Sequence, residues 1–152
     1  MVVDTAMYTI HTGFSALWAG TVLFVAIAVL PLAMDGKLSP AAFGSVVSKL
    51  QWITRISALL TFITGGHLAG TLYNIDRLTG TSSGYLVLVM LALWFFLAAV
   101  IEIGSAKAKR GVDQEKIREP ARDARPFYLL GAVLAVGLLV VAGLLGAPMS
   151  II

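Results

Sequence analysis

The chain has 152 residues, of which 59% are apolar and 12% are charged, with a mean hydropathy of +0.92 and a formal net charge of +3. A soluble core of this size cannot bury that much apolar surface, so the composition excludes a soluble globular domain and indicates an integral membrane protein. The sequence contains no cysteine, which excludes disulfides, thiolate metal sites and cysteine-ligated iron–sulfur clusters.

Four apolar segments are each long enough to cross the hydrocarbon core of a membrane as a helix, which takes roughly 20 residues. They are residues 8–33, 52–75, 85–103 and 127–147. They lack the alternating polar pattern of a membrane barrel strand, and helices satisfy every backbone polar group within the lipid. The sequence therefore predicts an all-α, antiparallel four-helix transmembrane bundle that forms a single domain over residues 1–152.

The basic residues predict the orientation of this bundle. Seven of the eleven lysines and arginines lie in the connection at 104–125, namely Lys107, Lys109, Arg110, Lys116, Arg118, Arg122 and Arg125. Because basic connections stay in the cytoplasm, we expect this one inside and both termini outside. Its charge is thus topological, and binding to nucleic acid is not expected. Pro120 and Pro126 are expected to interrupt the chain before the fourth span.

The connection before the second span carries a helix start. Ser39 followed by Pro40 is a favourable cap and first-turn pair, so we expect this helix to begin near Pro40 and to extend beyond the membrane on the cytoplasmic side. Two charges fall close to the inner ends of the spans. Arg55 in the second span and Glu102 in the third are at similar depth, which predicts a structural ion pair, with a proton pathway or an anionic group held by Arg55 as the alternatives.

The only two histidines, His11 and His67, lie inside apolar segments. An ionisable side chain at such a place suggests a ligand, a proton relay or a hydrogen bond between helices. The first two spans run antiparallel, which puts both histidines in the outer half of the membrane. They are therefore candidate axial ligands of one b-type haem held between the first two helices. From the helix ends, His67 is expected to lie roughly 6–8 Å deeper than His11.

Small and aromatic residues accompany the histidines. Gly66 and Gly70 flank His67, where their missing side chains allow either close packing of helices or room for a flat macrocycle. Trp18 is seven residues beyond His11 and therefore shares almost the same face of the first helix. We include Gly66, Gly70 and Trp18 with the histidines as candidate cofactor-binding residues.

A copper site is the alternative on the same side of the membrane. Met7 is four residues before His11, and Met149 follows the fourth span, so both are expected near the outer surface with the two histidines. Thioether and imidazole groups are ligands that suit Cu(I). Met7, His11, His67 and Met149 are the candidate metal ligands.

The first helix, from His11 through Trp18 and Gly20 to Pro31, resembles the first helix of the copper-resistance protein D superfamily. Arg55 and the glycines beside His67 are also similar to that superfamily. The resemblance covers residues 8–75. It implies an association with copper uptake, and the relatives include membrane-bound protoporphyrinogen oxidases thought to bind haem b.

Three hypotheses follow. The first is a small cytochrome-like membrane protein that binds haem b for electron transfer or haem metabolism; the second is a copper-binding or copper-transport protein. The third is a cofactor-free subunit of a larger membrane complex, in which the histidines only bridge helices. The sequence has no nucleophile triad, phosphate loop or carboxylate pair, so hydrolysis and phosphoryl transfer have no support. Other enzymatic activity, a redox partner and homo-oligomerisation stay open.

Overall fold

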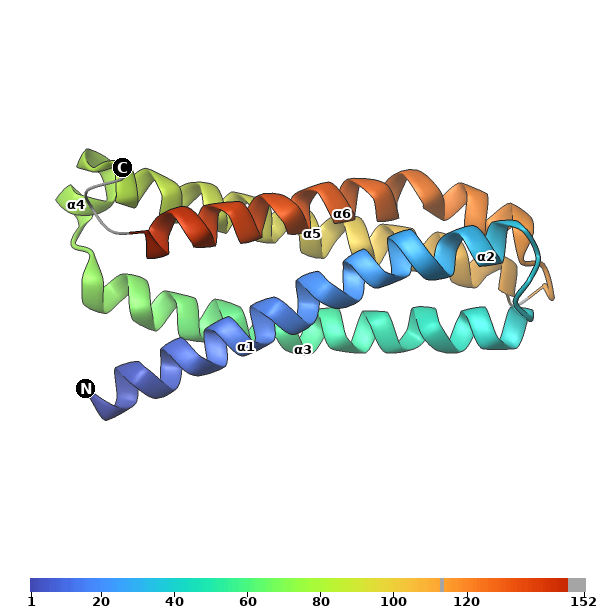
Figure 1. Cartoon of the computed structure of the whole chain (residues 1–152), viewed down its shortest axis with the longest axis horizontal. Helices are drawn as coiled ribbons and strands as arrows, with labels where there is room; N and C mark the ends of the chain where they lie inside the picture. The colour runs from blue at the N-terminus through green and yellow to red at the C-terminus, as the bar shows by residue number, and fades with distance from the viewer. Residues whose placement is uncertain (113, 148–152) are drawn as a thin grey trace.

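The computed structural model is a long antiparallel bundle (Figure 1). It describes residues 1–112 and 114–147. The elements are α1 (Val2–Phe24), η1 (Val25–Val29), α2 (Leu30–Met34), α3 (Pro40–Leu72), α4 (Ile75–Gly80), α5 (Ser82–Val112) and α6 (Arg118–Gly146). The α1–η1–α2 rod, α3, α5 and α6 are each long and apolar enough to cross a membrane. The predicted all-α, four-helix membrane bundle is therefore confirmed.

The first rod contains one wider turn of π-helix, η1, just before Pro31. A proline ring crowds the carbonyl four residues earlier and has no N–H to donate, and a π-turn accommodates such a residue without ending the helix. The rod ends at Met34, and Gly36, two residues later, has a φ of +72°. The N–H of Lys37 then bonds the carbonyl of Leu32 at 2.9 Å, so the chain reverses tightly toward α3.

The start of α3 is the one predicted from the sequence. The helix begins at Pro40, and the hydroxyl of Ser39 accepts a hydrogen bond from the N–H of Ala42 at 3.1 Å. Its 33 residues make a helix of roughly 50 Å, longer than the hydrocarbon core of about 30 Å. About two fifths of α3 therefore extends beyond the hydrocarbon core of a membrane that the bundle spans.

The other end of α3 differs slightly from the prediction. The helix stops at Leu72 and not at residue 75, because Tyr73 and Asn74 adopt extended backbone. The side chain of Asn74 accepts a hydrogen bond from the N–H of Arg77 at 2.8 Å and so begins the short helix α4.

Most of the basic connection is helical. Helix α5 continues to Val112 and α6 begins at Arg118, so both helices extend past the predicted spans. Pro120 and Pro126 lie within α6, and the interruption expected there is wrong. Pro120 is in the first turn, where backbone N–H groups have no helical partner and a proline costs little.

Helices α5 and α6 pack closely through glycines. A Cβ atom at Gly104 would lie 2.9 Å from Cβ of Phe127, and one at Gly111 would overlap the ring of Pro120. Small residues that let two backbones approach are typical of helix contacts inside membranes. This pair forms a compact hairpin on one side of the bundle.

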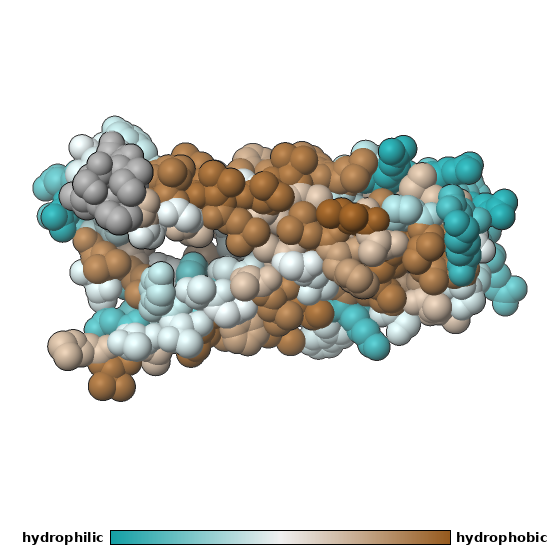
Figure 2. Space-filling model, viewed as in Figure 1, coloured by the Kyte–Doolittle hydropathy of each residue, from teal (hydrophilic) through white to brown (hydrophobic). Residues whose placement is uncertain are grey.

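The bundle has two unlike ends joined by an apolar flank (Figure 2). The basic end holds the 35–39 loop, the ends of α5 and α6 that face it, and most of the hydrophilic surface. The terminal end holds the N-terminus, α4 and the end of α6 (Figure 1). Large apolar side chains lie exposed along the flank, including Phe24, Phe62, Phe96 and Val133. Such a surface is suited to contact with a lipid bilayer.

Candidate functional site

Three side chains of α1, each seven residues from the next, form hydrogen bonds with α3. The carboxylate of Asp4 lies 3.2 Å from Nε2 of His67. Further along the same face come His11 and then Trp18, whose indole N–H donates to Oγ1 of Thr54 at 3.1 Å. Because a helix turns through nearly two full turns in seven residues, the three contacts form one row between α1 and α3.

The imidazole of His11 is fixed by two groups of α3. Its Nδ1 lies 3.1 Å from the carbonyl oxygen of Thr61 and 3.0 Å from the hydroxyl of Thr64. The carbonyl can only accept, and the Thr64 hydroxyl already donates to the carbonyl of Leu60 at 2.6 Å. Nδ1 therefore carries a proton, and in a neutral ring the lone pair is on Nε2. The ring lies against Gly65, where a Cβ would come within 2.9 Å of Cε1.

The imidazole of His67 is engaged by a different group. Its Nε2 donates to Oδ1 of Asp4, whose other oxygen lies 2.8 Å from the amino group of Met1. His67 is about a third exposed and Asp4 about half exposed. This contact is at the terminal end of the α1–α3 interface, where water reaches it.

The two histidines lie at the same α1–α3 interface but at different depths along the bundle axis. His67 is level with Asp4, whereas His11 is level with Thr61 and Thr64, roughly 5–10 Å further into the bundle. The expectation that His67 is the deeper residue is wrong, because α1 begins at Val2 and places Asp4 beside His67. In this arrangement the rings do not face a common point.

The other candidate cofactor residues divide into two groups. Trp18 is buried, and its ring meets that of Trp94 edge to face with centroids 6.5 Å apart. Gly66 and Gly70 lie on the exposed side of α3, where an added Cβ would meet no atom within 4 Å among the described residues. Gly65, the third glycine of this stretch and not among the candidate cofactor residues, is the one that contacts a histidine, the ring of His11.

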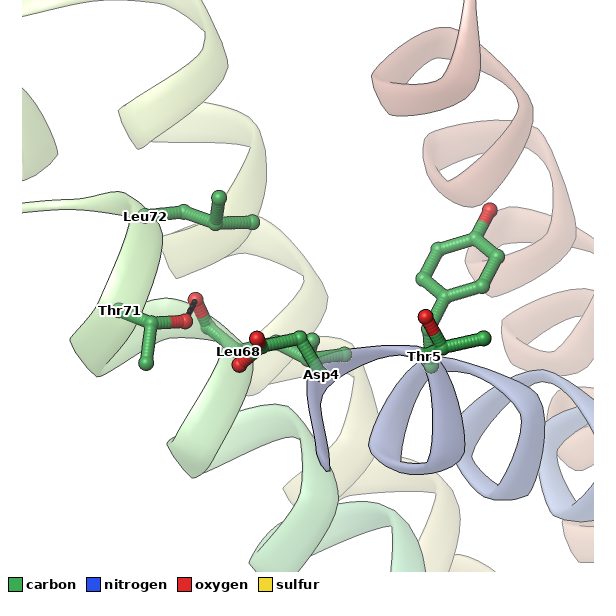
Figure 3. Close-up of a pocket in the computed structure, with 6 residues that line it drawn as sticks. Asp4, Thr5, Leu68, Thr71 and Leu72 are labelled. Carbon is green, nitrogen blue, oxygen red and sulfur yellow. Dashed lines mark hydrogen bonds between the residues drawn. The ribbon is translucent and has the colours of Figure 1, made fainter. Parts of the chain in front are cut away.

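A cleft of about 620 Å³ opens at the terminal end. It is lined by Asp4, Thr5, Tyr8, Leu68, Thr71 and Leu72. Figure 3 shows Asp4 and Thr5 of α1 opposite Leu68, Thr71 and Leu72 of α3. In Figure 2 the molecule is hollowed at this end, between α6 and the first part of α1.

These features permit a test of fit for a haem. His11 has one ring nitrogen held by a carbonyl, as metal-ligating histidines do, whereas neither histidine is among the residues that line the cleft. His67 fits as a second ligand to the same iron only after it releases Asp4 and the rings move to one level. A haem held by His11 therefore fits the residues better than one held by both histidines at once.

The predicted copper ligands are only partly described. Met7 lies one helical turn before His11 on α1, and Met149 lies outside the described residues. Within 1–112 and 114–147, no three His, Cys, Asp or Glu side chains gather as a metal site would require. A copper site on this chain would rest on the two histidines with thioether ligands.

Arg55 and Glu102 form the ion pair predicted from the sequence. Arg55 donates from Nε and Nη2 to the two oxygens of Glu102 at 2.7 and 3.0 Å, and Gln51 donates to Glu102 at 3.1 Å. The pair joins α3 to α5 toward the basic end, and its carboxylate is about a third exposed. Two parallel hydrogen bonds make this a well-fixed contact.

The sequence reasoning missed the polar face of α3. Thr54, Ser57, Thr61 and Thr64 are all buried, and the three threonines supply the partners of Trp18, Trp94 and His11. Their spacing of three, four and three residues is that of one helix face, a signal present in the sequence. The reasoning counted these residues only as part of an apolar span.

Comparison of the chain with protein-family models, with curated proteins and with solved structures gave no match in any of the three searches.

Proposed function

We propose that this protein is a small membrane haem protein in which His11 is an axial ligand of a b-type haem through Nε2. The observation that supports the proposal is the pair of acceptors on Nδ1, the carbonyl of Thr61 and the hydroxyl of Thr64. They hold the proton on Nδ1 and leave the lone pair on Nε2, as the outer-shell partners of metal-ligating histidines do.

The residues around His11 have separate roles in this proposal. Thr61 and Thr64 orient the ring, and Gly65 lets it lie close to α3. Asp4 holds His67 in reserve as the second axial ligand, which becomes available when the Asp4 contact opens. A bound haem would supply one-electron chemistry, for electron transfer to a redox partner or for haem metabolism.

The test is the absorption spectrum of the chain purified after expression with ample haem. Wild type is expected to show a Soret band, and His11→Ala to lose it. His67→Ala is expected to keep bound haem, because His11 supplies the ligand and His67 is engaged by Asp4. Thr12→Ala, a change on the exposed side of α1, is the control and should match wild type. A colourless wild-type protein would overturn the proposal, and bound copper in that protein would favour the copper alternative.

A cofactor-free subunit of a larger membrane complex is the second candidate, because both histidines already bond across the α1–α3 interface. Bare glycines on the exposed sides of α1 and α3 also leave room for a further helix, whether from another protein or from a second copy. They are Gly13, Gly20, Gly66 and Gly70. Co-purification of a larger assembly that survives loss of both histidines would favour this candidate.

We also propose that the basic end is cytoplasmic, on the strength of the positive charge in the α5–α6 connection. The natural chain has no cysteine, so single cysteines report exposure cleanly. In intact cells, Thr79→Cys in α4 should react with a membrane-impermeant maleimide, and Gln114→Cys only after the membrane is opened. The reverse pattern would show that the chain is inserted the other way round.

A further inference from the structure

Helix α3 turns a polar face into the centre of the bundle. The side chains of Gln51, Thr54, Ser57, Thr61 and Thr64 are at most 7% exposed and are separated by three, three, four and three residues. The outward face of the same helix carries apolar side chains such as Ile56, Phe62 and Ile63. The buried face spans about 20 Å, which is some two thirds of the hydrocarbon core.

Two tryptophans hold the hydroxyl groups of this face in place. Trp18 of α1 donates to Oγ1 of Thr54 at 3.1 Å, and Trp94 of α5 donates to Oγ1 of Thr61 at 3.1 Å. The two indoles touch edge to face between the helices. The hydroxyl groups are thus fixed from both sides at positions that bracket Ser57.

Ser57 is the exception on this face. Its side chain is fully buried, and among the described residues its hydroxyl has no hydrogen-bond partner. Buried polar groups without a protein partner are commonly satisfied by an internal water molecule. Along the helix Ser57 is about 4.5 Å from Thr54 and about 6 Å from Thr61, spans that a water can bridge.

Each end of the polar face meets a titratable side chain. At one end Thr64 bonds His11, and beyond it His67 and Asp4 reach the terminal surface. At the other end Gln51 bonds Glu102, which is about a third exposed. Chains of carboxylate, imidazole and hydroxyl groups inside membranes are the usual components of proton relays.

We propose that the buried face of α3 is a proton path between His11 and Glu102, completed by water bound at Ser57. A proton from water at the terminal end is taken up by His11 on Nε2, and the imidazole releases its Nδ1 proton toward Thr64. Each hydroxyl or water then accepts one proton and donates another, so its composition is unchanged. The Gln51 amide only donates to Glu102, so water next to Thr54 would pass the proton to Glu102, which releases it to water at the basic end.

Proton uptake and haem ligation would both use Nε2 of His11, so the proton path belongs to the chain without haem. The absorption spectrum tests haem binding and the proton flux tests the path. Because the two are measured independently, either proposal can fail while the other stands.

The experiment measures proton uptake by liposomes that contain the full chain and a trapped pH dye, driven by a potassium diffusion potential. Wild-type liposomes are expected to take up protons faster than protein-free ones. Ser57→Val, which replaces the hydroxyl and fills the space a water needs, is expected to lower the protein-dependent rate at least tenfold. Ser45→Ala, an exposed serine near the start of the same helix, is the matched control and should keep the wild-type rate.

A second variant guards against misfolding. Ser57→Ala removes only the hydroxyl oxygen from a site where it bonds no protein group, so the variant should stay monodisperse and helical while its proton flux falls. A wild-type rate equal to that of protein-free liposomes would overturn the proposal, as would equal rates for wild type and a folded Ser57→Ala.

Discussion

The α1–α3 and α5–α6 interfaces each hold two antiparallel helices together, but with different kinds of contact. Helices α1 and α3 are joined by polar contacts at seven-residue intervals, made by Asp4, His11 and Trp18. Helices α5 and α6 are joined by glycines that admit their neighbours, at Gly104 and Gly111. The first interface opens into a cleft at the terminal end, and the second stays closely packed.

The difference follows from the solvent. Inside a membrane the lipid is as apolar as leucine, so helices associate through close packing or through hydrogen bonds. Close packing makes the α5–α6 hairpin a rigid support, and its glycine contacts place no reactive side chain in the interface. Hydrogen bonding places imidazole, indole and hydroxyl groups where they can act on a ligand or a proton, which is why the candidate site is at α1–α3.

The largest expected effect is at the close-packed interface. Gly111→Ala should destabilise the bundle by about 2–3 kcal/mol, because the new methyl overlaps the ring of Pro120 and the helices must move apart. Gly104→Ala should act in the same direction. The measurement is the unfolding midpoint in a denaturing detergent, and Gly143→Ala, with open space around it, is the control. If Gly104→Ala and Gly111→Ala unfolded at the same midpoint as the control Gly143→Ala, glycine packing would not be what holds α5 to α6.

A double-mutant cycle measures the polar interface. His11→Ala and Thr64→Val should each destabilise the fold, with a coupling free energy of about 1 kcal/mol, since bonds between membrane helices average about 0.6 and reach about 1.7 kcal/mol. The same unfolding assay is applied to wild type, to the two single variants and to the double variant. Strictly additive effects would show that the His11–Thr64 bond contributes nothing to stability.

The smallest effect is expected from a polar contact placed in the close-packed interface. The hydroxyl groups of Tyr128 and Ser105 lie 3.2 Å apart between α5 and α6. Tyr128→Phe should cost about 0.5 kcal/mol, well below Gly111→Ala, because glycine packing carries that interface. A loss as large as that of Gly111→Ala would erase the contrast between the two interfaces.

Much of the fold was predictable because membrane insertion imposes simple rules. Apolar length gave the four rods, and Ser39 with Pro40 gave the start of α3. The positions of two prolines in the fold were not predictable from such local signals. The prolines at 120 and 126 were expected to break the chain, but one fits the first turn of α6 and the other is accommodated within it.

The sequence indicated several residues of the candidate site, but it did not predict which of them bond to one another. His11, Trp18 and the Arg55–Glu102 pair were identified from type and position alone. The contact of Gly65 with His11 and the hydroxyl groups of α3 were missed, because a glycine or threonine in an apolar span carries no sign of what it contacts. The relative depth of the histidines was wrong because α1 begins six residues before the apolar segment taken as its start.

The sequence by itself determined that this chain forms four apolar helices with a basic end, since hydrophobic length and charge act locally and require no knowledge of neighbours. Only the tertiary structure decided that His11 bonds α3 while His67 bonds Asp4. Hydrogen-bond partners depend on the rotation and offset of one helix against another, and side chains fifty or more residues apart set both.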